Sequence, residues 1–115
     1  MEVAREVARD MIARGFLDEV AGARREAERG VAKLWGNRRI LADVAAKGYG
    51  KAALAAAAAQ LSLEDGASRC AALMRRRHLS LTGEGTFDAR VIAALQRYGY
   101  STAEIKAAAK KAKAE

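Results

Sequence analysis

The sequence has no proline, one cysteine and one histidine, and aromatic residues make up only 5% of it. A single cysteine excludes a disulfide within the chain and, with one histidine, leaves a metal cluster without its usual ligands. The scarcity of aromatic residues and turn prolines argues against a β-sandwich or barrel. No apolar run could span a bilayer and no secretory signal is apparent, so we expect a cytoplasmic protein with no membrane contact.

Alanine is the abundant residue, with 29 copies among 115 residues. Alanine is the best helix former and proline the worst, so this composition favours helix throughout. The length allows one small domain or a few helical repeats that share a core. We therefore predict an all-α fold in a single domain, 1–115.

The charge is basic and unevenly distributed. The chain has 21 basic and 14 acidic residues, a net charge of +7. Residues 1–65 carry 11 basic and 10 acidic groups, whereas residues 66–115 carry 10 basic and 4 acidic groups. Such a balance indicates a polyanionic partner or an acidic protein surface, contacted mainly by the second half.

Glycines and short polar segments divide the chain into about seven predicted helices. Their ranges are 2–14, 19–34, 37–47, 51–60, 63–78, 87–98 and 102–113. We expect helix N-caps at Asp18, Asn37, Ser62 and Thr86, and a capping box that starts at Ser101. Gly48 is expected to end its helix in a left-handed conformation.

A helix–Gly–Tyr–helix unit occurs twice. A shift of 51 residues places Gly48-Tyr49 on Gly99-Tyr100, and a shift of 44 places Asp18 on Ser62 in the preceding helices. A partial third copy ends at Gly15-Phe16. The recurrence predicts tandem three-helix repeats in a curved, solenoid-like array.

Several short segments resemble the RecX family, which are bacterial regulators of the recombinase RecA. In order, they are Gly15-Phe16-Leu17-Asp18-Glu19, then Gly36-Asn37-Arg38-Arg39-Ile40 after Trp35, then Lys47-Gly48, and finally Arg97-Tyr98-Gly99-Tyr100-Ser101 with Ile105 four residues on. No single segment is specific, but their order and spacing together are. The resemblance covers nearly the whole chain from about residue 5.

The resemblance implies a fold of three tandem three-helix repeats. Residues 2–14 then look like the last helix of a partial first repeat, 17–61 like the second repeat and 62–113 like the third. Family members commonly have aromatic residues where Gly22 and Glu26 stand here. If the resemblance holds, we expect the chain to be a divergent member of the family or a fragment.

The resemblance also implies a function that is not enzymatic. The family binds RecA, lodges in the groove of its filament on DNA, and usually limits strand exchange and ATP hydrolysis. The residues agree, since no phosphate loop, nucleophile–base pair or carboxylate cleft is evident. No cofactor or metal is expected.

Basic residues are the candidates for contact with RecA or DNA, single- or double-stranded. These candidates are Arg24, Arg25, Arg38, Arg39, Lys47, Arg75, Arg76, Arg77 and Arg97. Three consecutive arginines on a helix point in different directions, so they cannot all face one partner. The alternative for each is a solvated charge, an ion pair or a complement to a helix dipole.

Other residues have mainly structural interpretations. We predict that Trp35 is a core plug between helices or else a partner anchor, and that Phe16, Tyr49 and Tyr100 pack at one repeated corner. Cys70 is predicted to be buried, and His78 to be exposed.

Two alternatives to a RecA regulator remain open. The first is a non-specific DNA-binding module, because the helix–Gly–Tyr–helix unit superficially resembles a helix-turn-helix. Its would-be recognition helix, 51–60, is almost pure alanine and cannot read base edges. The second is a scaffold for an acidic protein. A homodimer is a further option, since a second copy could cover helix faces that an absent first repeat leaves bare.

Overall fold

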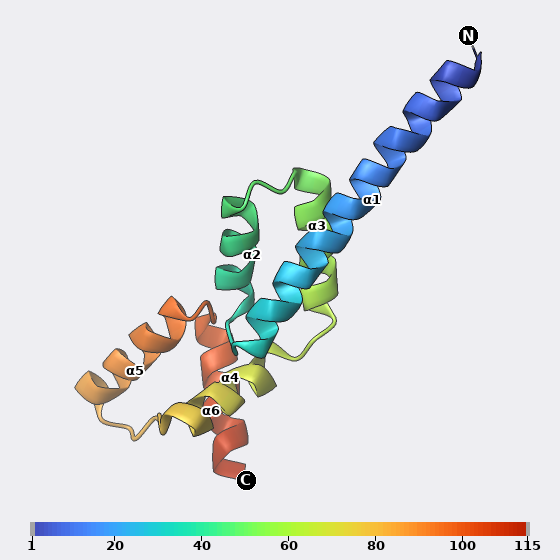
Figure 1. Cartoon of the computed structure of the whole chain (residues 1–115). Helices are drawn as coiled ribbons and strands as arrows, with labels where there is room; N and C mark the ends of the chain where they lie inside the picture. The colour runs from blue at the N-terminus through green and yellow to red at the C-terminus, as the bar shows by residue number, and fades with distance from the viewer. Residues whose placement is uncertain (1, 115) are drawn as a thin grey trace.

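A computed structural model describes the backbone of residues 2–114 and the side chains of residues 9–112. Six α-helices and no strand occur in this range, which confirms the all-α prediction (Figure 1). They are α1 (Glu2–Ala32), α2 (Asn37–Ala46), α3 (Lys51–Ser62), α4 (Gly66–Arg77), α5 (Gly85–Arg97) and α6 (Thr102–Ala114).

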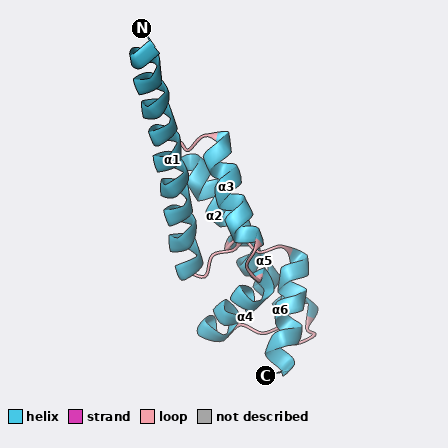
Figure 2. Cartoon of the chain, turned by 90° about the vertical axis from the view of Figure 1, so that its right-hand side faces the viewer, coloured by secondary structure: helices cyan, strands magenta, loops and turns pink. Residues whose placement is uncertain are grey.

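The helices form two groups of three, each with its own apolar core. The N-terminal group joins α1, α2 and α3 around Ala23, Ala27, Ile40, Val44, Ala53, Ala57 and Leu61. The C-terminal group joins α4, α5 and α6 around Cys70, Ala71, Leu73, Met74, Val91, Leu95, Tyr100, Ile105 and Ala108. Alanines at facing positions let the second half of α1 lie close to α3 (Figure 2).

The molecule is elongated, with extents of 71 × 24 × 19 Å, because α1 extends well beyond the helices that pack on it (Figure 1). The predicted separate helices 2–14 and 19–34 are therefore wrong, as is the Asp18 cap, since α1 runs through both. A lone glycine costs a helix about 1 kcal/mol relative to alanine and does not break it. Six helices replace the expected seven.

Two of the predicted caps are confirmed. Ser101 Oγ accepts from the Glu104 N–H at 3.2 Å, and Glu104 Oε1 accepts from the Ser101 N–H at 2.9 Å, which is a capping box. Gly48 has φ of +89° after the last turn of α2, as expected for a left-handed cap.

The other cap predictions are wrong because neighbouring residues take their place. α4 starts at Gly66, with Asp65 accepting from Ala67 and Ser68, while Ser62 Oγ donates to the Ala59 carbonyl inside α3. Gly36 precedes α2 and Glu84 precedes α5, so neither Asn37 nor Thr86 is an N-cap.

The predictions for single side chains are mostly confirmed. Cys70 is fully buried, His78 is exposed, and Tyr100 is 1% exposed at the core of its group. Tyr49 is half-buried against the other core. Phe16 contradicts the repeated-corner prediction, because it is 48% exposed on the projecting part of α1.

Gly22 and Glu26 on α1 each contact the segment that follows α2. A Cβ on Gly22 would lie 2.8 Å from the Tyr49 hydroxyl, so the tyrosine ring fills the space that a larger residue at 22 would need. Glu26 pairs with Lys47 at the end of α2.

The ends of the helices correspond between the two groups. Leu34 after α1 and His78 after α4 are the only described non-glycine residues with positive φ, 61° and 54°, and they lie 44 positions apart. Gly48 after α2 and Gly99 after α5 share a left-handed conformation and lie 51 positions apart. These offsets equal those of the sequence correspondence; the repeat and solenoid arrangement stays a prediction.

Candidate functional site

The two helical groups join where the α1–α2 loop meets the α5–α6 loop. The Gly36 N–H donates to the Tyr98 carbonyl at 2.7 Å, and the Arg38 N–H donates to the Gly99 carbonyl at 3.3 Å. The Tyr100 hydroxyl donates to the Leu34 carbonyl at 2.7 Å. This junction fixes two loops that are about sixty residues apart in the sequence.

Arg69 of α4 is hydrogen-bonded to the α1–α2 side of the same junction. Arg69 as a whole is 7% exposed, and its Nη1 donates to the Trp35 carbonyl at 3.0 Å and to Asn37 Oδ1 at 2.8 Å. Its Nη2 pairs with Glu64 at 2.7 Å. Both terminal nitrogens of this buried guanidinium thus have hydrogen-bond acceptors, which offset the cost of burying its charge.

Cations and aromatic rings gather around this junction. We call the following residues the basic–aromatic cluster: Lys33, Trp35, Arg39, Arg76, Arg77 and Tyr98. The Arg39 guanidinium carbon lies 4.2 Å from the centre of the Trp35 ring and 5.7 Å from that of Tyr98. Arg77 lies 6.0 Å from the Tyr98 ring centre, and the Lys33 ammonium 4.6 Å from that of Trp35.

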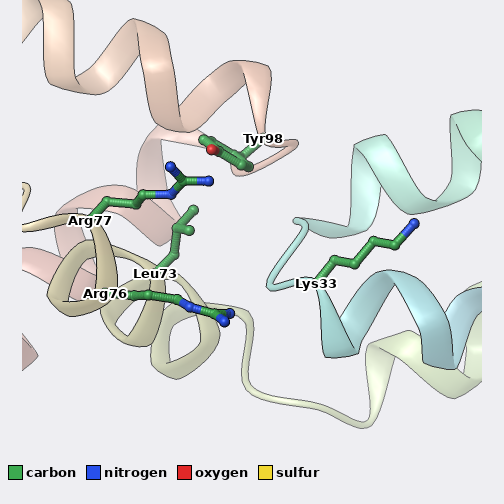
Figure 3. Close-up of a pocket in the computed structure, with 5 residues that line it drawn as sticks. All are labelled: Lys33, Leu73, Arg76, Arg77 and Tyr98. Carbon is green, nitrogen blue, oxygen red and sulfur yellow. The ribbon is translucent and has the colours of Figure 1, made fainter.

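A hollow of about 310 Å³ opens in the cluster, lined by Lys33, Leu73, Arg76, Arg77 and Tyr98. Figure 3 shows Arg76 and Arg77 leaving α4 toward the gap, with the Arg77 guanidinium beside the Tyr98 ring. Lys33 borders the opposite side, and its ammonium points away from the two arginines (Figure 3). Buried Leu73 supplies an apolar floor.

Local structure explains part of this arrangement. Arg76 and Arg77 lie in the last turn of α4, where the negative end of the helix dipole favours cations. The left-handed His78 then ends the helix and turns the chain away. Arg39 lies in the first turn of α2, where the dipole disfavours a cation. Cation–π contacts with two rings hold it there.

The structure brings together three of the nine predicted contact residues. Arg39, Arg76 and Arg77 belong to the cluster. Arg38 is exposed beside it on α2, and Arg97 is exposed in the last turn of α5. Arg24 and Arg25 are exposed on α1, and Arg24 borders a separate hollow of about 500 Å³ between α1 and α3. Arg75 is exposed on α4.

Lys47, the remaining predicted contact, is engaged by carboxylates. Its ammonium binds Glu26 and lies 3.1 Å from Asp43 Oδ2. The hydrogen bond to Glu26 raises the pKa of Lys47 above its usual value, and the same bond lowers the pKa of Glu26. Lys47 thus links α2 to α1.

Sequence reasoning missed Lys33, Arg69 and Tyr98 as members of the junction. Two signals were available. Arg69 lies four residues before Leu73, on the apolar face of its helix, and an arginine there needs buried partners. The 44-residue shift places Lys33 on Arg77, so that both would end equivalent helices.

The chemistry of the cluster is that of anion binding. Guanidinium groups form paired hydrogen bonds with phosphate or carboxylate oxygens. None of the five residues that line the hollow is acidic. Among the described residues, no group of three or more His, Cys, Asp or Glu could hold a metal ion, and no helix has the length and apolarity to cross a membrane.

Comparisons with known proteins give no match: no family model, curated protein or solved structure resembles the chain significantly.

Proposed function

We propose that the chain is a RecX-like regulator that binds RecA and its filament on DNA and limits recombinase activity. The observation that carries the proposal is the contact between two segments that resemble family motifs. The segment 36–40 and the segment 97–101 meet at the junction, through the Gly36–Tyr98 and Arg38–Gly99 hydrogen bonds. Two motif-like segments that are far apart in the sequence are therefore in contact in the fold.

The two groups of three helices support the repeat organisation that the resemblance implies. Residues 17–61 and 62–113, taken as the second and third repeats, each contain one of the two apolar cores. The continuous α1 modifies this division, because the segment 2–14 is the first part of the same helix that packs in the N-terminal group. In this proposal the basic side of the array occupies the filament groove and obstructs the incoming duplex.

A titration of RecA-catalysed ATP hydrolysis on single-stranded DNA tests the proposal. The chain is added at two salt concentrations, beside a control for its binding to the same DNA without RecA. Suppression at concentrations that barely bind naked DNA supports the proposal. Unchanged hydrolysis at saturating protein overturns it.

A non-specific DNA-binding module is the second candidate. The basic–aromatic cluster favours it, because all four of its cations are exposed. In that case hydrolysis would fall only as far as the protein sequesters naked DNA, and binding would weaken steeply with salt.

A further inference from the structure

We infer that the basic–aromatic cluster binds the backbone phosphates of a nucleic-acid strand, with one phosphate in the hollow between Arg76 and Arg77. The inference identifies a contact site for the proposed function. It rests on that function only for the choice of a nucleic acid as the bound polymer. It rests on the composition of the cluster, its unbalanced charge and its position across two helical groups.

The first argument is charge. Lys33, Arg39, Arg76 and Arg77 gather at one junction, and no ion pair joins any of them to a carboxylate within the described residues. Arg29 and Lys47, which are also exposed, are instead ion-paired with Glu26 and Asp43. Like charges in proximity repel, so the cluster is most stable when an anion lies among them.

The second argument separates this site from ordinary helix capping. The dipoles of α1 and α4 account for Lys33, Arg76 and Arg77 near the two C-terminal ends. They do not account for Arg39, which lies at the N-terminal end of α2 against its dipole. The rings of Trp35 and Tyr98 hold this guanidinium, so its place in the cluster is built by the fold.

The third argument is shape. A hollow of about 310 Å³ lies at the lower end of the range for ligand sites, roughly 300–1,000 Å³. Its mouth is cationic, whereas Leu73 and Tyr98 provide an apolar wall for a sugar or base edge. A nucleotide unit has this division between a charged phosphate and less polar sugar and base. An acidic peptide also offers carboxylate oxygens to guanidiniums, but it has no sugar and planar base to lie against the wall that Leu73 and Tyr98 form.

The test compares two double variants that lower the net charge equally. Arg76→Gln with Arg77→Gln alters the hollow, whereas Arg9→Gln with Arg14→Gln alters two exposed arginines on the projecting part of α1. Binding to a fluorescent oligothymidine is measured by anisotropy from 50 to 200 mM salt. We expect the first variant to bind at least tenfold more weakly and to reduce the salt slope by about 0.7, for the loss of one phosphate contact with a single strand. The control should change less than threefold.

A second measurement reports on the site itself. Trp35 is the only tryptophan, and two cations of the cluster lie against its ring. Addition of the oligonucleotide should change its fluorescence in the wild type and in the control variant. The change should be absent from the variant at 76 and 77, whose circular dichroism and unfolding midpoint should match the wild type.

Competitors distinguish the sources of the anion. Inorganic pyrophosphate and a polyglutamate with the same total charge as the oligonucleotide are each titrated against the bound oligonucleotide. Binding of duplex DNA is compared with that of the single strand. Displacement by either competitor at the oligonucleotide's own concentration would overturn the inference, as would equal losses in the two variants. Displacement only at concentrations that act as bulk salt supports it.

The same variants in the RecA assay keep the two proposals separate. If wild-type protein leaves RecA unchanged but the two variants differ on oligonucleotide, the phosphate site stands and the RecA role fails. If wild-type protein suppresses RecA and the variant at 76 and 77 binds DNA like the control, the RecA role stands and the phosphate site fails.

Discussion

Gly36 and Gly99 meet backbone to backbone at the junction of the two helical groups. A Cβ on Gly36 would overlap the carbonyl of Gly99, and a Cβ on Gly99 would lie 2.5 Å from the Arg39 amide nitrogen. Gly99 also has φ of +104°, a conformation that L side chains rarely adopt. Only glycine at both positions allows the loops to approach so closely.

Gly36→Ala should destabilise the chain by about 2 kcal/mol or more, because backbone and not a flexible side chain occupies the space for the new methyl group. Urea unfolding followed by circular dichroism measures the loss. Gly85→Ala is the matched control: nothing lies within 4 Å of its Cβ, and a change within about 0.5 kcal/mol is expected. Equal unfolding midpoints for the two variants would contradict a close backbone contact at Gly36.

Arg69→Ala should cost about 3 kcal/mol, because it leaves the Trp35 carbonyl and Asn37 without their buried donor. Arg69→Lys should restore little of this stability, since one ammonium cannot reproduce the forked guanidinium that reaches both the Trp35 carbonyl and Asn37. Arg29→Ala provides the comparison, since Arg29 is a surface arginine paired with Glu26 and its removal should cost under about 1 kcal/mol. Chemical unfolding of all three variants measures the free energy of unfolding. A loss for Arg69→Ala no larger than that for Arg29→Ala would contradict a buried, bridging role for Arg69.

Most of the helices could be predicted from the sequence because helix formation and capping depend on residues that are close together in the chain. The alanine-rich composition and absence of proline specify helix wherever glycine does not intervene. Ser101 and Glu104 are three residues apart, so their capping box is readable from the sequence. Gly48 ends α2 for an equally local reason, its left-handed conformation.

The junction and the basic–aromatic cluster could not be predicted from the sequence, because they form through contacts between segments that are far apart in the chain. Nothing near Gly36 in the sequence indicates that Gly99 lies against it, and nothing near Tyr98 indicates that Arg39 and Arg77 would share its ring. Gly15 misled in the opposite way. A glycine commonly marks a helix end, but the residues on both sides favour helix strongly enough to continue through it.

Gly15→Ala should therefore strengthen α1 locally without changing global stability. Its Cβ would meet nothing within 4 Å, and residues 9–18 are exposed. Alanine gains about 1 kcal/mol over glycine in a helix interior, which corresponds to roughly fivefold slower amide exchange if opening is local. Hydrogen exchange resolved by residue measures the effect over positions 9–20. Unchanged exchange there would mean that the helix does not continue through position 15.

Cys70 makes stability depend on pH above the neutral range. Burial raises the pKa of its thiol from 9.0 to about 12. Between these values the unfolded chain loses the thiol proton while the folded chain keeps it. Stability is thus fully present below pH 9 and falls as pH rises toward 12, by up to about 1.4 kcal/mol per unit. Burial also raises the pKa of Tyr100, which adds a loss of the same sign above its ordinary value of 10.0.

Unfolding in urea at pH 8.0, 9.5 and 10.5 tests this dependence against Cys70→Ala. The variant should lack the cysteine contribution and keep that of Tyr100, so its stability should fall less between pH 8.0 and 9.5 than that of the wild type. A thiol reagent at pH 8 should modify the folded wild type only as fast as the chain opens, because Cys70 is fully buried and protonated. Identical pH profiles, together with rapid modification in the folded state, would place Cys70 at the surface and contradict the packing of α4 on α6.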